Sequence, residues 1–488
     1  MVRVSEHYGI SGDQGTLDFI DVEIDRDTLL FIDPAVIASI DGPWENACTS
    51  AIQSFFQAVL DCIKNGEQNK AKSLLSRLSE DNSTRLGYSS RNRGSGLGLK
   101  LAEEFYKELS SSRAVQSGLI ADLEDTALLI DNVGEDRISD VVTNIVRNLL
   151  AEYTQAAAEY YGIPLKRNVA MHPYWAPSTK KWTTAYFDLP IAGGSPLLLV
   201  PKSIVRKLLL INPGEYYQHY VLTQLFDEEL RGQSQLTTAL RSEKRPRITK
   251  ASVDRMHKDR FKGLRGAEKR ISLETTEKNP DLIARYKQDK LKNPPAAISA
   301  AIIAEVTKTE LPDLDALLQT VTSMPGGGGS LADNYEKAIE ALLSALLYPS
   351  LVNPVRQEKI HEGRKRIDIS YTNMGRNDFF YWLSQHYPAA NVFIECKNYT
   401  RPLKNPEFDQ LSGRFSPSRG KYGILVYRGY SDKPAVQRSL KDTAVDDRGY
   451  ITALDDEDLG VLVDEYKKVG SATLLDGLLH TRFKALTH

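Results

Sequence analysis

The sequence predicts an α/β protein of several domains. A chain of 488 residues is too long for one ordinary hydrophobic core. Strand-like apolar runs alternate with helical stretches, and a glycine-rich run, Pro325–Ser330, divides the chain by composition. The hydrophobic content of 41% and the charged content of 26% are those of folded globular proteins, and the formal charge of −2 says nothing about nucleic acid.

The cysteines and the apolar runs bear on the compartment. Cys48, Cys62 and Cys396 are an odd number of widely spaced cysteines, and no secretory segment opens the chain, so we expect free thiols in a reducing cytoplasm. No apolar run is long enough to span a bilayer, so we expect no membrane partner. The eight histidines are scattered, and no Cys/His spacing suggests zinc.

Residues 1–240 are expected to form a mixed α/β region that senses a signal or targets the protein. Strands are predicted at Thr28–Ile32, Thr126–Ile130 and Pro196–Val200, because these runs are apolar and short. Helices are predicted over Asn46–Ile63 and Ile138–Tyr160.

Residues 241–322 are expected to form a basic, mainly helical connector. Between Arg241 and Arg270, twelve Lys or Arg residues stand against four Asp or Glu residues. Such a surface is suited to nucleic-acid phosphates, and a solvated helical face explains it equally well. The candidate phosphate contacts are Arg255, Lys258, Arg260 and Lys262.

Residues 323–330 are predicted to be a flexible linker, and residues 331–488 to fold as a separate domain. Its first helix is expected to begin at an N-cap, Asp333, with leucines at helical spacing behind it. Glu336 then either completes a capping box or leans over the sheet, since it lies roughly 60° from the centre of the apolar stripe at about 100° per residue.

The remaining elements of this domain follow from short apolar runs and helix-start signals. We expect strands near Val355–Ile360, Arg366–Tyr371, Asn391–Tyr399, Gly423–Tyr427 and Tyr450–Leu454, with helices around Asp378–His386 and after Asn405-Pro406. The last of these helices contains Gln410.

Two of the predicted strands carry charged residues among apolar ones. Side chains alternate between the faces of a strand, so Glu395 and Lys397 must project together, while Ile394 and Cys396 point the other way. Asp368 stands between two isoleucines on the upstream strand. Burying this charge costs several kcal/mol unless a metal ion or a counter-charge compensates it. The arrangement could hold a divalent cation beside a phosphodiester, or it could be a structural ion-pair network.

The order of elements carrying Glu336, Asp368, Glu395-Cys396-Lys397 and Gln410 resembles the PD-(D/E)xK nuclease superfamily, particularly its restriction-endonuclease-like members related to Mrr. The resemblance covers residues 331–468, and it implies an αβα core with a mixed central sheet. It further implies that Asp368, Glu395 and the backbone carbonyl of Cys396 ligate Mg²⁺ or Mn²⁺, with Glu336 orienting metal or water. Residue 367 is isoleucine where the motif has proline, and the insert between the two catalytic strands is longer than in the simplest members.

The resemblance assigns roles to the remaining polar residues. Lys397 would position or activate the attacking water: as an ammonium it stabilises developing charge, and with a lowered pKa it accepts the water's proton. Gln410 would lie beside the site. Arg414 and Arg419 are either phosphate contacts or caps of their own loop.

These observations lead to a functional expectation for the whole chain. We expect a Mg²⁺-dependent endonuclease, acting on DNA as a dimer or larger homo-oligomer, with residues 1–330 controlling or targeting it. A role in bacterial restriction or anti-phage defence, with a partner protein of such a system, follows by family analogy alone. The alternative is a non-catalytic nucleic-acid-binding or scaffold protein that retains a remnant nuclease fold.

Overall fold

The computed structural model of the chain describes residues 2–78, 82–88, 98–131, 133–231, 248–264, 266–292, 296–360, 365–429 and 432–487. It divides into two compact units. The N-terminal unit comprises residues 1–2, 22–200 and 204–295, and the C-terminal unit comprises residues 3–21, 201–203 and 296–488. The chain therefore passes between the units five times, and neither unit is one continuous segment.

The N-terminal unit is mainly helical. Its helices are α2 (Pro34–Ala38), α3 (Pro43–Lys64), α4 (Gln68–Leu75), α5 (Gly98–Ser111), α6 (Arg113–Gln116), α7 (Leu123–Leu129), α8 (Glu135–Ile145), α9 (Arg147–Tyr161), α10 (Pro213–Tyr216), the π-helix Tyr217–Val221, α11 (Leu222–Arg231), α13 (Lys250–Asp259), α14 (Ala267–Lys278) and α15 (Asp281–Lys292). Its strands form two-stranded sheets: β1 (Phe31–Ile32) with β8 (Val205–Arg206), β2 (Lys166–Ala170) with β5 (Tyr186–Leu189), β3 (Tyr174–Ala176) with β4 (Lys181–Thr183), and β6 (Ile191–Ala192) with β7 (Ser195–Pro196).

Two predictions for this unit are wrong. The predicted strand Thr126–Ile130 lies in helix α7 apart from its last residue, because Asp122 and Asp125 form a capping box that starts a helix there. Residues 197–200 form no strand, although all four are buried. The helix predicted over Ile138–Tyr160 is present as α8 and α9, with a break at Val146. The connector is helical as expected where the structure describes it, whereas residues 241–247 lie outside the described residues.

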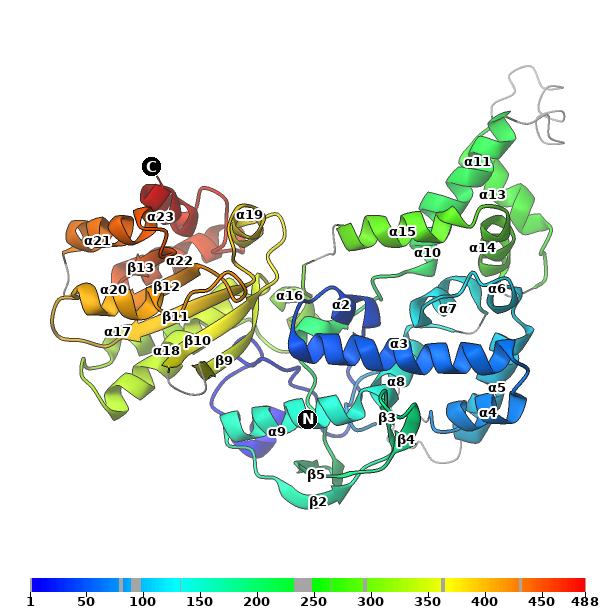
Figure 1. The fold of residues 1–488 in the computed structure, drawn as a ribbon, viewed down its shortest axis with the longest axis horizontal. Coiled ribbons are helices and arrows are strands. Elements are labelled where there is room, and N and C mark those ends of the chain that lie inside the picture. The colour runs from blue at the N-terminus through cyan, green and yellow to red at the C-terminus, as the bar shows by residue number, and fades with distance from the viewer. Residues whose placement is uncertain are drawn as a thin grey trace. The chain divides into compact units, whose positions relative to one another are not determined.

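The C-terminal unit is built on one five-stranded mixed sheet (Figure 1). The strands are β9 (Leu351–Ile360), β10 (Lys365–Asn373), β11 (Asn391–Lys397), β12 (Tyr422–Tyr427) and β13 (Tyr450–Leu454), in the order β13-β12-β11-β10-β9. Strands β11, β12 and β13 run parallel, while β10 is antiparallel to both of its neighbours. The helices of this unit are α1 (Val4–Tyr8), α16 (Ala300–Thr307), α17 (Leu314–Ser323), α18 (Ser330–Leu347), α19 (Phe379–His386), α20 (Asn405–Ser412), α21 (Lys433–Val445), α22 (Asp456–Val469) and α23 (Leu478–Thr487).

Helices cover both faces of this sheet. On one face, Val392, Ile394 and Ile424 share a core with α17, α18, α19, α22 and α23. On the other, Phe393 and Leu425 share a core with α20 and α21. Period-two alternation along β11 thus gives apolar residues to both layers, because a strand buried on both faces needs them on both. The expected α/β class and mixed sheet are present.

The start of the C-terminal unit differs from the predicted linker and domain boundary. Helix α17 lies before the glycine-rich run, yet its Leu314 and Val321 are buried in the core beside α18. Within the run, Gly327 N donates to Asn398 O (2.8 Å), and Asn398 Nδ2 donates to Pro325 O (3.1 Å). A Cβ at Gly326 would lie 2.6 Å from the Thr400 methyl, so glycine permits this close approach. The run therefore belongs to the unit, and α18 begins at Ser330, ahead of the predicted N-cap Asp333.

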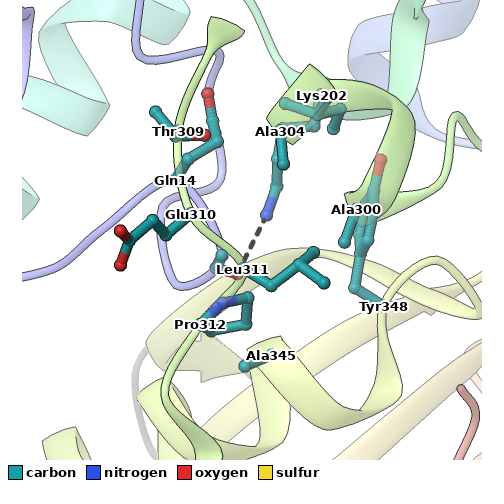
Figure 2. Close-up of a pocket in the computed structure, with 12 residues that line it drawn as sticks. Gln14, Lys202, Ala300, Ala304, Thr309, Glu310, Leu311, Pro312, Ala345 and Tyr348 are labelled. Carbon is teal, nitrogen blue, oxygen red and sulfur yellow. Dashed lines mark hydrogen bonds between the residues drawn. The ribbon is translucent and has the colours of Figure 1, made fainter. Parts of the chain in front are cut away.

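Two short segments from the N-terminal part of the sequence are built into the C-terminal unit. Lys202 Nζ donates to Gly15 O (3.3 Å) and lies 4.4 Å from the centre of the Tyr348 ring, in the small pocket of Figure 2. Burial lowers the pKa of Lys202 to about 8, although Asp18 and Asp13 partly offset the effect. The cavity of about 10 Å³ has room for about one water molecule, so it is not a substrate site.

Candidate active site

The candidate site lies where strands β10 and β11 stop pairing. Their ladder runs from Thr372 opposite Asn391 to Ile369 opposite Ile394. At the next position Asp368 Oδ2 accepts a hydrogen bond from the backbone N–H of Cys396 (2.9 Å). The Asp368 carboxylate thus occupies the place of a ladder acceptor. By this register it stands across from Glu395, and residues directly opposite in an antiparallel pair project to the same face.

Glu395 is fully buried, and one of its oxygens has no partner. Oε1 accepts hydrogen bonds from Lys397 Nζ (2.5 Å) and from Gln410 Nε2. Oε2 is buried without a hydrogen-bond partner in the part of the chain that the structure describes. Burial and the Asp368 carboxylate raise the pKa of Glu395 to about 7, since Lys397 offsets them only in part. A buried carboxylate oxygen without a partner is unfavourable unless a cation occupies the space beside it.

Lys397 is an ammonium held between two acceptors. Its side chain is 8% exposed, and Nζ donates to Glu395 Oε1 and to Gln410 Oε1 (3.2 Å). Burial lowers the pKa of Lys397, but the Glu395 carboxylate, assisted by Asp368, more than reverses this and raises it. Of the two roles considered from the sequence, this environment favours charge stabilisation over proton acceptance.

Glu336 lies on the buried face of α18, and side chains of the sheet strand β9 hold its carboxylate in place. Gln357 Nε2 donates to Oε1 (2.5 Å) and Oε2 (2.6 Å), and Arg356 Nε donates to Oε1 (3.2 Å). Burial raises the pKa of Glu336, and the Asp368 charge adds to the rise. Of the two interpretations of Glu336, the structure agrees with the one in which it leans over the sheet. Sequence analysis missed Arg356 and Gln357, although polar residues in a predicted strand near Glu336 were an available signal.

Arg414 and Arg419 follow helix α20, which carries Gln410. Arg419 Nη2 donates to Arg414 O (3.1 Å), so Arg419 does cap its own loop. The charge of Arg414 lowers the pKa of Glu395, which puts this guanidinium within electrostatic reach of the site. The Nε atoms of Arg414 and Arg419 are both buried without a hydrogen-bond partner among the described residues, so this feature does not separate them. Because the charge of Arg414 reaches Glu395 while Arg419 caps the loop, Arg414 is the better phosphate-contact candidate of the two.

The candidate residues of the connector belong to the N-terminal unit. Lys258 pairs with Glu268 (2.8 Å) and Asp254 (3.1 Å), and Arg260 pairs with Glu274 (2.8 Å). Arg255 and Lys262 are exposed. Pairing reduces the charge that Lys258 and Arg260 offer to a phosphate, so the candidates with exposed, unshared charge are Arg255 and Lys262.

Asp368 and Glu395 lie where strands β10 and β11 stop pairing, a place that we call the β10–β11 fork. The side chains at this fork fit a hard divalent cation. They supply carboxylate oxygens, the buried Glu395 Oε2 lacks a partner among the described residues, and Lys397 and Arg414 relieve the like charge of Asp368 and Glu395 only in part. Within the described residues, no three His, Cys, Asp or Glu side chains form a ready metal-binding group. The fit therefore concerns two carboxylates completed by the Cys396 backbone carbonyl and by water, as Mg²⁺ sites commonly are.

All three cysteines are free thiols, and burial raises the pKa of the Cys396 thiol well above its usual range. Among the helices that the structure describes, none has the length and apolar character needed to cross a bilayer.

Residues 9–212 match the family described as "Domain of unknown function (DUF8370)". The match covers less than half of the chain and does not include the candidate site. Within the matched range, residues 9–21 and 201–203 lie in the C-terminal unit, and residues 22–200 and 204–212 lie in the N-terminal unit. Comparison with curated proteins and with solved structures gives no match.

Proposed function

We propose that the C-terminal unit is a metal-dependent nuclease that hydrolyses phosphodiester bonds, with DNA as the expected substrate. The observation that carries the proposal is Glu395: a fully buried carboxylate with one oxygen unpartnered, facing the like charge of Asp368 and bonded to Lys397. An unpartnered oxygen also occurs in an ordinary ion pair of this chain, since Asp456 Oδ1 has no partner among the described residues although Asp456 is paired with Arg428. What distinguishes Glu395 is that it is fully buried and faces a second carboxylate, Asp368, which a structural ion pair has no need of. The sheet order and the polar residues on α18 and α20 agree with the restriction-endonuclease resemblance.

In this proposal Asp368, Glu395 and the Cys396 carbonyl would hold Mg²⁺ or Mn²⁺. The bound ion neutralises phosphodiester charge and lowers the pKa of a coordinated water. Gln410 fixes Glu395 and Lys397 by bonding both of them. Lys397 presents its ammonium to the charge that develops on the phosphate oxygens in the transition state.

Substrate binding is assigned to the arginine after α20 and to the connector. Arg414 contacts a backbone phosphate near the bond that is cut, since its charge acts on Glu395 and its Nε lacks a partner among the described residues. Arg255 and Lys262 add nonspecific affinity. One such site cuts one strand, so cleavage of a duplex requires a homodimer or successive nicks.

The N-terminal unit regulates or targets the nuclease, and a bacterial defence role with a partner protein is carried over from the resemblance alone. A cytoplasmic location is part of the same proposal.

The test is a cleavage assay with the full chain. Supercoiled plasmid, linear duplex, single-stranded DNA and RNA are incubated with Mg²⁺, with Mn²⁺, or with EDTA, beside a Glu395→Gln variant. We expect metal-dependent cleavage by the unaltered chain only. Cleavage that persists in EDTA, or equal cleavage by Glu395→Gln, would refute the proposed site. Metal binding without cleavage of any substrate would favour the non-catalytic alternative.

A further inference from the structure

Strand β9 contains two residues in the left-handed backbone region: Asn353 at φ +52° and Gln357 at φ +53°. Asparagine adopts this region readily, whereas glutamine does so rarely. The conformation of Gln357 is therefore strained, and it persists only because its surroundings hold it.

The strained backbone has a clear geometric result. In a regular strand the neighbouring residues Arg356 and Gln357 would point to opposite faces of the sheet. Here both reach Glu336: Gln357 Nε2 donates to both carboxylate oxygens (2.5 and 2.6 Å), and Arg356 Nε lies 3.2 Å from Oε1. Arg356 Nε also lies 3.6 Å from Glu340 Oε2.

Besides the strained φ, the contact between Gln357 and Glu336 has a second unfavourable feature. The carbonyl oxygen of Gln357, Oε1, is buried and has no hydrogen-bond partner within the described residues. Arg356 lies beside both Glu336 and Glu340 and shares its charge between them, and the neutral amide of Gln357 adds no charge. A contact that is unfavourable in two ways and does not change the charge balance points to a functional reason for it.

The register of the sheet places Gln357 opposite Asp368. Arg356 pairs with Ile369 and Glu358 pairs with Ile367, so Gln357 stands directly opposite Asp368. Asp368 in turn stands across from Glu395 on the next strand. Gln357 is thus the third member of a row across β9, β10 and β11, and its amide is turned away to hold a third carboxylate.

We propose that Gln357 is a positioning residue that fixes the Glu336 carboxylate beside Asp368 and thereby sets the affinity of the site for its divalent cation. The inference rests on the proposed metal site. It assigns Gln357 no contact with substrate. Removal of groups that orient metal ligands commonly lowers metal affinity or activity by about 10- to 100-fold.

The structure offers a matched pair of variants. Gln357→Gly removes the amide and relieves the strained φ, so the relief offsets part of the cost of losing two hydrogen bonds to Glu336 and the variant should remain folded. Asn353→Gly makes the same backbone change four residues earlier, where the side chain contacts Ser203 (3.0 Å) instead of Glu336. Gln357→Asn keeps an amide and tolerates φ +53°, but it is one methylene too short to reach Glu336.

Mn²⁺ binding by the full chain, measured by calorimetry, is the main readout, with thermal midpoint and the kcat and KM of cleavage beside it. We expect Gln357→Gly and Gln357→Asn to bind Mn²⁺ about 10-fold more weakly and to lose kcat with KM for DNA unchanged. Asn353→Gly should match the unaltered chain in Mn²⁺ affinity, kcat and KM, and the loss of its bond to Ser203 should affect the thermal midpoint alone. Unaltered Mn²⁺ affinity in a folded Gln357 variant would overturn the inference. Absence of Mn²⁺ binding by the unaltered chain would instead overturn the proposed metal site, and the inference with it.

Discussion

Replacing Asp368 with asparagine should make the metal-free protein more stable while it removes activity. The asparagine side-chain oxygen can still accept the Cys396 N–H, so the backbone contact is kept. The change removes the charge that raises the pKa of Glu395 and of Glu336. A catalytic cluster of like charges opposes folding until its cation binds, and this variant removes part of that opposition.

The magnitude follows from the pKa of Glu395. A rise from 4.5 to about 7 opposes the ionised form by roughly 3 kcal/mol at high pH, at about 1.4 kcal/mol per unit. Burial is the larger cause and Asp368 the second, so the variant should recover about 1 kcal/mol. For a unit of roughly 200 residues this corresponds to an increase of about 2–4 °C in thermal midpoint.

The linkage between proton binding and folding determines the sign of the stability change and the pH range in which it appears. The folded pKa of Glu395 is raised, so its contribution to stability is full below about pH 4.5 and is lost as pH rises through about 7. The advantage of Asp368→Asn should therefore be present at pH 8 and absent at pH 4.5.

Scanning fluorimetry of the full chain in EDTA, at both pH values, provides the assay. Mg²⁺ added at pH 8 should raise the midpoint of the unaltered chain and leave that of the variant unchanged. Cleavage by the variant should fall by more than about 100-fold. A midpoint lowered by Asp368→Asn at pH 8 would refute the reasoning, because it would make Asp368 a stabilising partner rather than a repelling one.

Three further predictions concern the surrounding charges. Lys397→Ala should lower kcat by about 100- to 1,000-fold, because the variant lacks the ammonium that stabilises charge in the transition state. Single-turnover cleavage measures the rate, and circular dichroism checks the folding. A kcat close to that of the unaltered chain would remove Lys397 from the mechanism. Arg414→Ala should weaken substrate binding about 10-fold, measured by filter binding with Ca²⁺ in place of Mg²⁺. The control is Arg448→Ala, which should bind normally because the Arg448 guanidinium is already ion-paired with Asp409 (2.5 Å). Equal effects of the two variants would assign Arg414 a loop-capping role. Charge reversal of Arg255 and Lys262 to Glu should lower the slope of log affinity against log salt by about 2, and an unchanged slope would take the connector away from the substrate.

The sequence predicted the C-terminal elements well where local signals agree. Strands β11, β12 and β13 are short apolar runs with turn residues on both sides, and α20 opens with Asn405-Pro406. Asp368, Glu395, Lys397 and Gln410 then meet because the strand and helix order brings them together.

The features that the sequence did not predict, or predicted wrongly, have different physical causes. Residues 126–130 are apolar and β-compatible, and only the capping pair Asp122/Asp125 marks them as helix. The glycine-rich run is held by Asn398, a contact that composition cannot show. The grip of Gln357 on Glu336 depends on a left-handed residue inside a strand and on the register with β10. Both are properties of the folded sheet that no local pattern in the sequence encodes.

Locating the metal ion directly tests the central claim. Crystals of the full chain soaked in Mn²⁺ and measured for anomalous scattering should show a peak within coordination distance of Asp368 and Glu395 Oε2, and Asp368→Asn crystals should lack it. A peak bound elsewhere, or an unoccupied fork at saturating Mn²⁺ in crystals of an unaltered chain that cleaves DNA in a metal-dependent manner, would contradict the account.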